Sequence, residues 1–253
     1  MHEQANNRPA TERPSMYFDA QHLGAPSDCY VCWIDVMGSK NHMSQSIKTS
    51  ANFVFKLHCA LLMGVDGVDV DQRDNISVYP VMDGAFVTCE SRSALDAMLG
   101  HTMRALARNF LQESQNRHRF VVRGATAYGR VYHGKNLAAE ASRTLHANQR
   151  IRNSILLGLP MVLAFEEERA APPFGIAIER SARSMSPAET EPYQFTWWKW
   201  YRSAGAGVDL SQLRDQIDQF FQWHIARYLE SQYNKDAIEH HREMARQYFL
   251  TQT

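Results

Sequence analysis

One acidic residue ends an apolar run just before a glycine turn. Residues 29–43 read CYVCWIDVMGSKNHM, in which Asp35 follows apolar side chains and Gly38 comes shortly after it. A carboxylate at the buried end of a strand costs free energy unless a cation or a hydrogen-bond donor offsets its charge. The pattern therefore predicts either a basic partner or a divalent metal ion beside Asp35.

A second acid lies in the segment ISVYPVMDGAFVTCE, residues 76–90. Asp-Gly between two apolar runs is a strong signal for a β-hairpin turn, so we expect that turn at Asp83 and Gly84. If the first strand lies beside the hairpin, Asp35 and Asp83 converge on one point. Mg²⁺ takes carboxylate oxygens together with phosphate oxygens of a substrate. The two acids are thus candidate ligands of two metal ions, although each alone has an ordinary explanation as a turn residue or a helix cap.

The remaining elements alternate between strands and helices. Hydrophobic spacing and turn residues set their limits. Strands are expected at residues 29–36, 119–134, 158–165, 174–180 and 193–201, with a hairpin at 76–90, and helices at 41–64, 91–114, 137–152 and, in two pieces split near 233–234, from 209 onward. This order predicts an α+β fold of the ferredoxin-like kind, with a mixed or antiparallel sheet flanked by helices. We expect a polar N-terminal arm at 1–26, a catalytic domain at 27–205 and a C-terminal helical extension at 206–253.

Composition narrows the classes of function. Lys plus Arg and Asp plus Glu each number 27, which argues against broad, non-specific binding of nucleic acid. No apolar run approaches the ~20 residues of a membrane span, and the N-terminus has no apolar signal core. The cysteines are expected to be buried, reduced thiols, and the expected compartment is the cytoplasm. The pair His240–His241 is expected to be solvated.

Three segments carry a resemblance to a known family. WIDVMGSK, VYPVMDGAFV and RGATAYGRVYHG resemble the class III nucleotide cyclases over about residues 29–180. The resemblance implies a ferredoxin-like domain that dimerises head to tail and uses two Mn²⁺ or Mg²⁺ ions. It implies attack of the ribose 3′-hydroxyl on the α-phosphorus of a nucleoside triphosphate, with release of diphosphate. Asp35 and Asp83 would bind the ions, and the backbone of Val36, Met37 and Gly38 would lie near the phosphates.

The family also has a helix with an Asn and, four residues later, an Arg that stabilises charge on the α-phosphate. LAAEASRTL is similar to that stretch, with Arg143 at the Arg position and Ala139 at the Asn position. The resemblance implies that Arg143 reaches into the partner's site in a homodimer. Arg123, in the strand VVRGATAYG, is expected either to contact phosphate or to pair with an acid.

The base-reading position of the family holds Tyr79, four residues before Asp83, where adenylate cyclases carry Lys and guanylate cyclases carry Glu. A short, stand-alone chain of this kind resembles the pyrimidine cyclases of bacterial Pycsar anti-phage systems. That resemblance implies cyclic UMP made from UTP, and it favours UTP over CTP. The product would act on a separate effector.

Other functions stay open. The domain could be an adenylate or guanylate cyclase, or a degenerate cyclase domain that binds a nucleotide without turnover, which Ala139 favours and the two acids oppose. A metal-dependent nucleotidyl enzyme with a related palm-type sheet would carry two adjacent acids in the hairpin, whereas this hairpin has one.

Overall fold

The computed structural model describes residues 15–185, 193–202, 207–227 and 235–250. It divides into two compact units, which we call the small unit (Met1–Pro26 and Tyr132–Leu157) and the core unit (Ser27–Val131 and Gly158–Thr253). The domain boundaries expected from the sequence stay a prediction.

The core unit is built on a sheet with the strand order β2-β3-β1-β4-β6-β7. β1 pairs antiparallel with both β3 and β4, and β4 pairs parallel with β6. The order β2-β3-β1-β4, with helices after β1 and after β3, is the ferredoxin-like arrangement, so the predicted fold class is confirmed. The strands are β1 (Ser27–Val36), β2 (Ser77–Val81), β3 (Gly84–Cys89), β4 (Val122–His133), β6 (Ile176–Ile178) and β7 (Trp197–Trp198).

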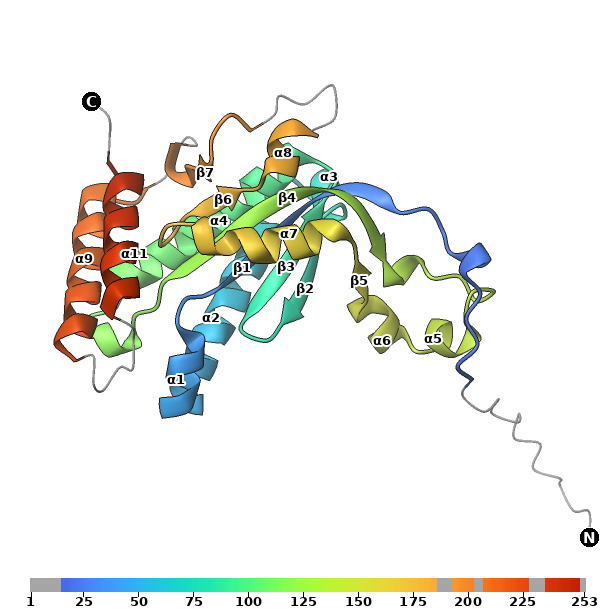
Figure 1. Ribbon diagram of the computed structural model, residues 1–253, viewed down its shortest axis with the longest axis horizontal. Helices are drawn as coiled ribbons and strands as arrows, with labels where there is room; N and C mark the ends of the chain where they lie inside the picture. Colours follow the sequence, from blue (N-terminus) through green and yellow to red (C-terminus); the bar gives the residue numbers. More distant parts are fainter. Residues whose placement is uncertain (1–14, 186–192, 203–206, 228–234, 251–253) are drawn as a thin grey trace, which may run out of the picture. The chain divides into compact units, whose positions relative to one another are not determined.

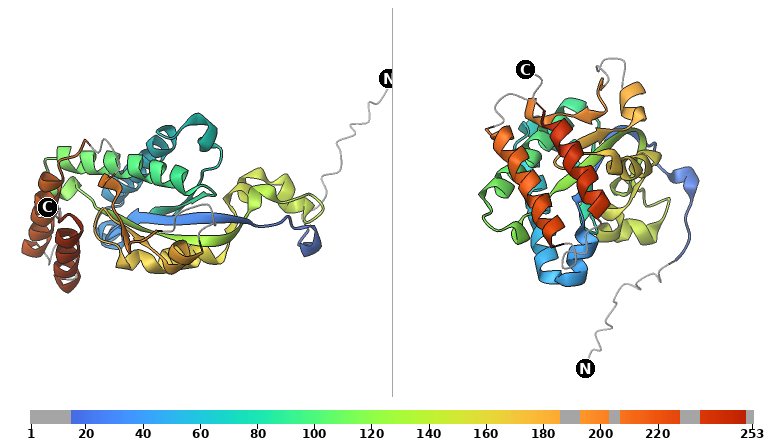
Figure 2. Two further views of the ribbon diagram at one scale, coloured as in Figure 1. Left: turned by 90° about the horizontal axis from the view of Figure 1, so that it is seen from above. Right: turned by 60° about the vertical axis from the view of Figure 1, so that its left-hand side comes forward.

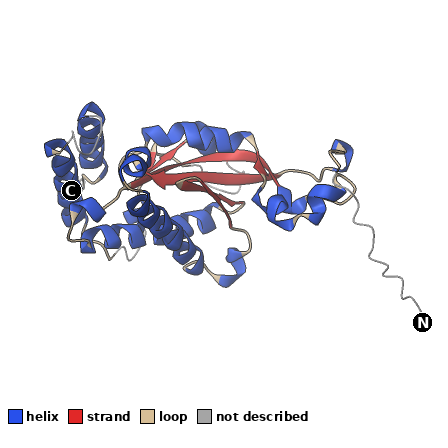
Figure 3. Cartoon of the chain, turned by 90° about the horizontal axis from the view of Figure 1, so that it is seen from below, coloured by secondary structure: helices blue, strands red, loops and turns tan. Residues whose placement is uncertain are grey.

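Helices cover both faces of this sheet (Figures 2 and 3). The long helices α2 and α4 pack together on one face, and α7 lies on the other (Figure 1). β1 is therefore buried on both sides, which explains why it reads as a continuous apolar run rather than an alternating one. The helices of this unit are α1 (Ser39–Gln45), α2 (Ile47–Asp66), α3 (Val70–Arg73), α4 (Arg92–Gln112), α7 (Leu159–Glu167), α8 (Arg180–Ser184), α9 (Leu210–Ala226) and α11 (Lys235–Tyr248), with 3-10 turns η2 (Asn116–His118), η4 (Glu168–Ala170) and η5 (Trp200–Arg202).

Caps explain where several helices begin. The Ser91 hydroxyl accepts from the Ala94 amide at the start of α4, as the sequence predicts. The helix expected at 41–64 is instead two, because Ser46 adopts extended backbone angles and its side chain caps α2 through the Thr49 amide.

The segment GLPMVLAF was expected to be a strand, and this was wrong. It forms most of α7, which begins directly after Gly158 and has Pro160 in its first turn. Proline is favoured there because its missing amide hydrogen would have no partner inside the helix. This helix covers the face of β1 that carries Trp33 and Asp35, and the rings of Trp33 and Phe165 lie 5.6 Å apart.

The small unit holds the described part of the expected N-terminal arm and the segment that follows β4. Residues 137–152 were expected to form one helix, but only α5 (Arg143–Ala147) and α6 (Gln149–Ser154) form there, after the 3-10 turn η3 (Gly134–Asn136). The end of β4 pairs with β5 (Leu156–Leu157), and η1 (Ala20–His22) is capped by Asp19. The Asp19 amide donates to the Ala141 carbonyl at 2.8 Å, which ties the arm to this segment.

The cysteines are free thiols, and Cys29, Cys32 and Cys89 are buried. Burial raises the pKa of Cys32 to about 12, so this thiol stays protonated at neutral pH. Cys59 is exposed, contrary to the expectation that all four are buried. Within the described ranges, no helix combines the length and the apolar character needed to cross a membrane.

Candidate active site

Asp35 lies at the end of the central strand, between two neighbouring strands. In the register of the sheet its Cα is opposite Gly84 of β3 on one side and opposite Arg123 of β4 on the other. Residues paired in this way share one face of an antiparallel sheet. Trp33 lies two residues before Asp35 on the same strand, so both side chains point to one face of the sheet. This is the face that α7 covers.

Gly84 lets the hairpin approach Asp35 closely. A Cβ at this position would lie 2.5 Å from the Ile34 carbonyl oxygen and 2.7 Å from the Trp33 ring, which no side chain can accommodate. The two-residue turn itself is Met82 and Asp83, one position earlier than the sequence predicted, and Met82 has a positive φ of 50°. Gly84 is already in the strand opposite Asp35, and Asp83 is the residue directly before it in the chain.

The two predicted carboxylates therefore lie close enough to interact. The pKa of Asp35 is raised to about 8, mainly by burial and also by the negative charges of Glu168 and Asp83, while Arg123 opposes them. Asp35 Oδ1 is buried and has no hydrogen-bond partner among the described residues. Asp83 accepts a hydrogen bond from the hydroxyl of Ser39, the first residue of α1.

This environment fits a divalent cation. A buried carboxylate oxygen without a donor, beside a second carboxylate, is the kind of oxygen that a hard cation binds. In the described part of the chain, no three His, Cys, Asp or Glu side chains are arranged to hold a metal. Asp35 and Asp83 would thus supply the protein ligands, and the remaining positions would be left to phosphate oxygens and water.

Arg123 pairs with an acid rather than pointing freely to solvent. Its guanidinium forms an ion pair with the buried carboxylate of Glu168 in η4, directly after α7. The sequence left open whether Arg123 contacts phosphate or pairs with an acid, and the structure gives it this partner. Glu168 was not anticipated, because its segment was expected to follow a strand. Pro160 in the first helical turn, followed by an apolar run and Glu166–Glu168, was the available signal.

His241 of the C-terminal helix also reaches Arg123. Its Nε2 lies 3.3 Å from Arg123 Nη1. The pKa of His241 is lowered to about 4, mainly by burial and also by the charge of Arg123. The ring is therefore neutral at pH 7, and since guanidinium groups only donate, Nε2 accepts. The expectation that His240 and His241 are both solvated was wrong for His241, because α11 turns this side chain toward the sheet.

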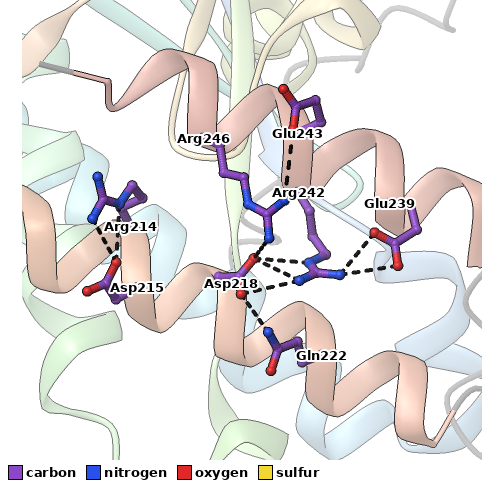
Figure 4. A network of polar contacts seen from close by, with 8 residues as sticks. All are labelled: Arg214, Asp215, Asp218, Gln222, Glu239, Arg242, Glu243 and Arg246. Atoms are coloured by element: carbon purple, nitrogen blue, oxygen red, sulfur yellow. Dashed lines mark hydrogen bonds and ion pairs between the residues drawn. The ribbon is translucent and has the colours of Figure 1, made fainter. Parts of the chain in front are cut away.

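Ion pairs hold α11 against α9 and so fix the position of His241 (Figure 4). The Asp218 carboxylate of α9 accepts from Arg242 Nε at 3.1 Å and from Arg246 Nη2 at 2.9 Å. Arg242 also pairs with Glu239 on its own helix at 2.9 Å. One carboxylate on α9 thus binds two arginines that lie one turn apart on α11.

The loop after β1 is only partly available to a ligand. Val36 and Met37 are buried, and the Met37 amide donates to the Val121 carbonyl at 2.9 Å. Gly38 has a φ of 73°, in the left-handed region that favours glycine, and it leads directly into α1. The Met37 amide is therefore already engaged, a point that the sequence did not reveal.

Tyr79 lies on the same face as Asp35, one row farther from the strand end. Its Cα is opposite Phe86, which in turn is opposite Trp33. The rings of Trp33 and Phe86 are 4.6 Å apart. Burial raises the pKa of Tyr79, and its hydroxyl interacts with Ser77. Tyr79 thus belongs to an aromatic row beside the acids.

Arg143 is the first residue of α5 in the small unit, where it is exposed. Ser142 caps this five-residue helix by accepting from the Leu145 amide. The structure thus brings Asp35, Asp83 and Arg123 together and adds Glu168 and His241. The role of Arg143 in a partner's site stays a prediction.

Comparisons with known proteins place no family name on the chain. No family model matches it, and no curated protein matches its sequence. A monomeric guanylyl cyclase domain of the RhoGC fusion protein from the aquatic fungus Blastocladiella emersonii aligns with a TM-score of 0.46 at 11% identity, over 63% of this chain and 85% of that chain. A bacterial light-regulated adenylyl cyclase aligns with a TM-score of 0.41 at 9% identity, over 61% of this chain and 44% of that chain. The fold assignment rests on the strand order alone.

Proposed function

We propose that this protein is a nucleotide cyclase that converts UTP to 3′,5′-cyclic UMP and diphosphate. One observation carries the proposal: Asp35 and Asp83 meet across β1 and β3 at a strand end, and Asp35 keeps a buried carboxylate oxygen without a donor. Such a pair suits a divalent cation that also binds a triphosphate.

In the proposed reaction the ribose 3′-hydroxyl loses its proton to water, its oxygen forms a bond to the α-phosphorus, and the bond from that phosphorus to the bridging oxygen breaks. The departing diphosphate takes the bonding electron pair. Bound Mn²⁺ or Mg²⁺ would supply charge neutralisation at the phosphates and acidify the 3′-hydroxyl. Asp35 and Asp83 would hold the ions, and Ser39 orients Asp83 through its hydrogen bond. Gly38 leaves room beside the phosphates because it has no side chain.

The base would lie near the aromatic row that contains Tyr79. Tyr79 is buried, with 7% of its surface exposed, and its bulk favours a pyrimidine over a purine because it reduces the space for a base. UTP is the favoured substrate, and CTP is the alternative. Cyclic UMP would then act on a separate effector in the cytoplasm, as the resemblance to anti-phage cyclases suggests.

A homodimer would complete the site. Arg143 would approach the α-phosphate bound by the partner and stabilise its developing charge. The outer side of α7 supports an interface on the site-bearing face, because large apolar side chains are exposed there, with Leu159 67%, Val162 51% and Phe165 43% accessible.

The second candidate is a domain that binds a nucleotide without turnover. Two features favour it. Arg123 is already neutralised by Glu168, and Ala139 stands where the family has an Asn.

A product assay separates the candidates. The purified chain is incubated with ATP, GTP, CTP or UTP and Mn²⁺, and the products are resolved by chromatography. We expect cyclic UMP from UTP, and none from the Asp35→Ala variant. A cyclic purine nucleotide as product would support the cyclase activity and contradict the preference for a pyrimidine substrate. Binding of a triphosphate without any product would favour the second candidate.

A further inference from the structure

A cavity in the core unit is lined by residues that the proposed reaction does not use. It has a volume of about 270 Å³ and lies where the end of α1, the start of α2, the turn η2 and the end of α9 meet. Ten residues line it: His42, Gln45, Ser46, Thr49, Asn116, Arg117, His118, Trp223, His224 and Arg227.

The lining is cationic. Arg117 and Arg227 carry permanent charges, and none of the described residues that line the cavity is an Asp or a Glu. Arg117 Nε donates to the neutral amide oxygen of Gln115 at 2.9 Å, so its charge stays uncompensated in that contact. Arg227 lies with its guanidinium carbon 5.0 Å from the centre of the Trp223 ring. Arginine guanidinium groups suit an anion with several oxygens, because their donors match such oxygens in pairs.

The lining of the cavity includes a buried histidine. His224 is 3% exposed, and the rings of His42 and His224 are 6.2 Å apart. The pKa of His224 is lowered to about 4, mainly by burial and also by the neighbouring His42. An anion would reverse this effect, because its charge favours the protonated imidazole. Hydroxyl and amide groups of Gln45, Ser46 and Asn116 complete a polar lining.

We propose that this cavity binds a phosphomonoester, a small molecule with one terminal phosphate. Its volume of about 270 Å³ lies just below the range of about 300–1,000 Å³ that is typical of ligand pockets, which suits a small ligand. The arginines would bind the phosphate, the histidines would share protons with it, and the indole of Trp223 would contact the organic part.

The position of α1 links this cavity to the candidate active site. Ser39 at the start of α1 bonds to Asp83, whereas His42 and Gln45 near its end line the cavity. The helix has seven residues, which corresponds to a length of about 10 Å. A ligand that contacts His42 or Gln45 thus acts on the helix that positions Ser39. This coupling rests on the proposed function, whereas the binding itself does not.

Calorimetry tests the binding on the full chain in EDTA, so that metal-dependent triphosphate binding does not contribute. The probes are inorganic phosphate, ribose 5-phosphate and UMP. We expect at least one of them to bind, and the double variant Arg117→Gln/Arg227→Gln to weaken that binding at least 10-fold. Arg214→Gln, which removes an arginine from the exposed side of α9 outside the cavity, serves as the matched control and should bind as the wild type does. All variants are checked for an unchanged melting temperature.

Absence of binding by every probe, or equal binding by the double variant, would overturn the proposal. A preference for UMP over ribose 5-phosphate would show that the base is recognised as well. Product formation measured with and without the bound probe then tests the coupling. We expect at least a twofold change in the wild type and none in the double variant. If no triphosphate yields product, the proposed function fails while the binding result stands.

Discussion

Asp35 and Arg123 face each other across β1 and β4, and Glu168 pairs with Arg123 while raising the pKa of Asp35. Three ionisable groups from three elements therefore share one partly buried space. A strand-end acid is tolerated there in its protonated form, and a bound cation would favour the ionised form.

The first prediction concerns stability and pH in the absence of metal. The pKa of Asp35 is about 8 in the folded chain, against about 3.9 for an unfolded aspartate. The folded state then binds a proton that the unfolded state has lost, so stability falls as the pH rises from about 4 through 8. Asp35→Asn should remove this loss and raise the melting temperature at pH 8 by several degrees, with little change at pH 4.

Melting curves in EDTA at several pH values provide the measurement. Asp28→Asn, at the exposed end of the same strand, is the control. Equal pH dependence in the wild type and in Asp35→Asn would show that Asp35 is not the group responsible.

The second prediction concerns metal binding without turnover. A ligand that binds only the folded state raises its stability by mass action. Millimolar Mn²⁺ should raise the melting temperature of the wild type at pH 8, and Asp35→Asn and Asp83→Asn should each lose most of that rise. Asp28→Asn should keep it. A full rise in either site variant would place the ion elsewhere.

The third prediction concerns Glu168. Its charge raises the pKa of Asp35, so Glu168→Gln should lower that pKa. The pH at which Mn²⁺ produces half of its maximal rise in melting temperature should then fall by about one unit. Glu166→Gln, an exposed neighbour at the end of α7, is the matched control. An unchanged midpoint in Glu168→Gln would mean that the two carboxyl groups do not interact.

The fourth prediction concerns the attachment of α11. Asp218→Asn weakens the contacts with Arg242 and Arg246 and should cost about 1 kcal/mol, since the pair is partly buried. Amide hydrogen exchange should speed up in α11 and stay unchanged in β1. Asp215→Asn, whose carboxylate pairs with its neighbour Arg214, should leave exchange in α11 as it is. Identical exchange in both variants would deny Asp218 this role.

The fifth prediction concerns the proposed dimer. Asp35→Ala and Arg143→Ala should each be inactive or strongly impaired alone, with Arg143→Ala lowering kcat more than affinity because it acts on charge in the transition state. Mixed heterodimers of the two variants should regain part of the wild-type activity, because one of the two sites is then intact. No recovery after verified mixing would place Arg143 outside the partner's site.

The sequence by itself determined the local elements that have strong short-range signals. β1 reads as a strand because it is apolar throughout, α4 begins where Ser91 caps it, and the hairpin follows from turn residues between two apolar runs. These features depend on neighbours in the chain, so spacing and residue type suffice. The order of those elements then predicts the ferredoxin-like sheet, and with it the meeting of Asp35 and Asp83.

Only the tertiary structure decided what surrounds those acids. GLPMVLAF has a short apolar pattern that suits a strand or a helix, and packing on β1 selects the helix α7 that delivers Glu168. His241 lies in a charged helix, and its direction depends on how Asp218 holds α11 against α9. The partners of Asp35 and Arg123 come from positions far away in the chain. Long-range packing brings them together, and local sequence patterns do not predict such contacts.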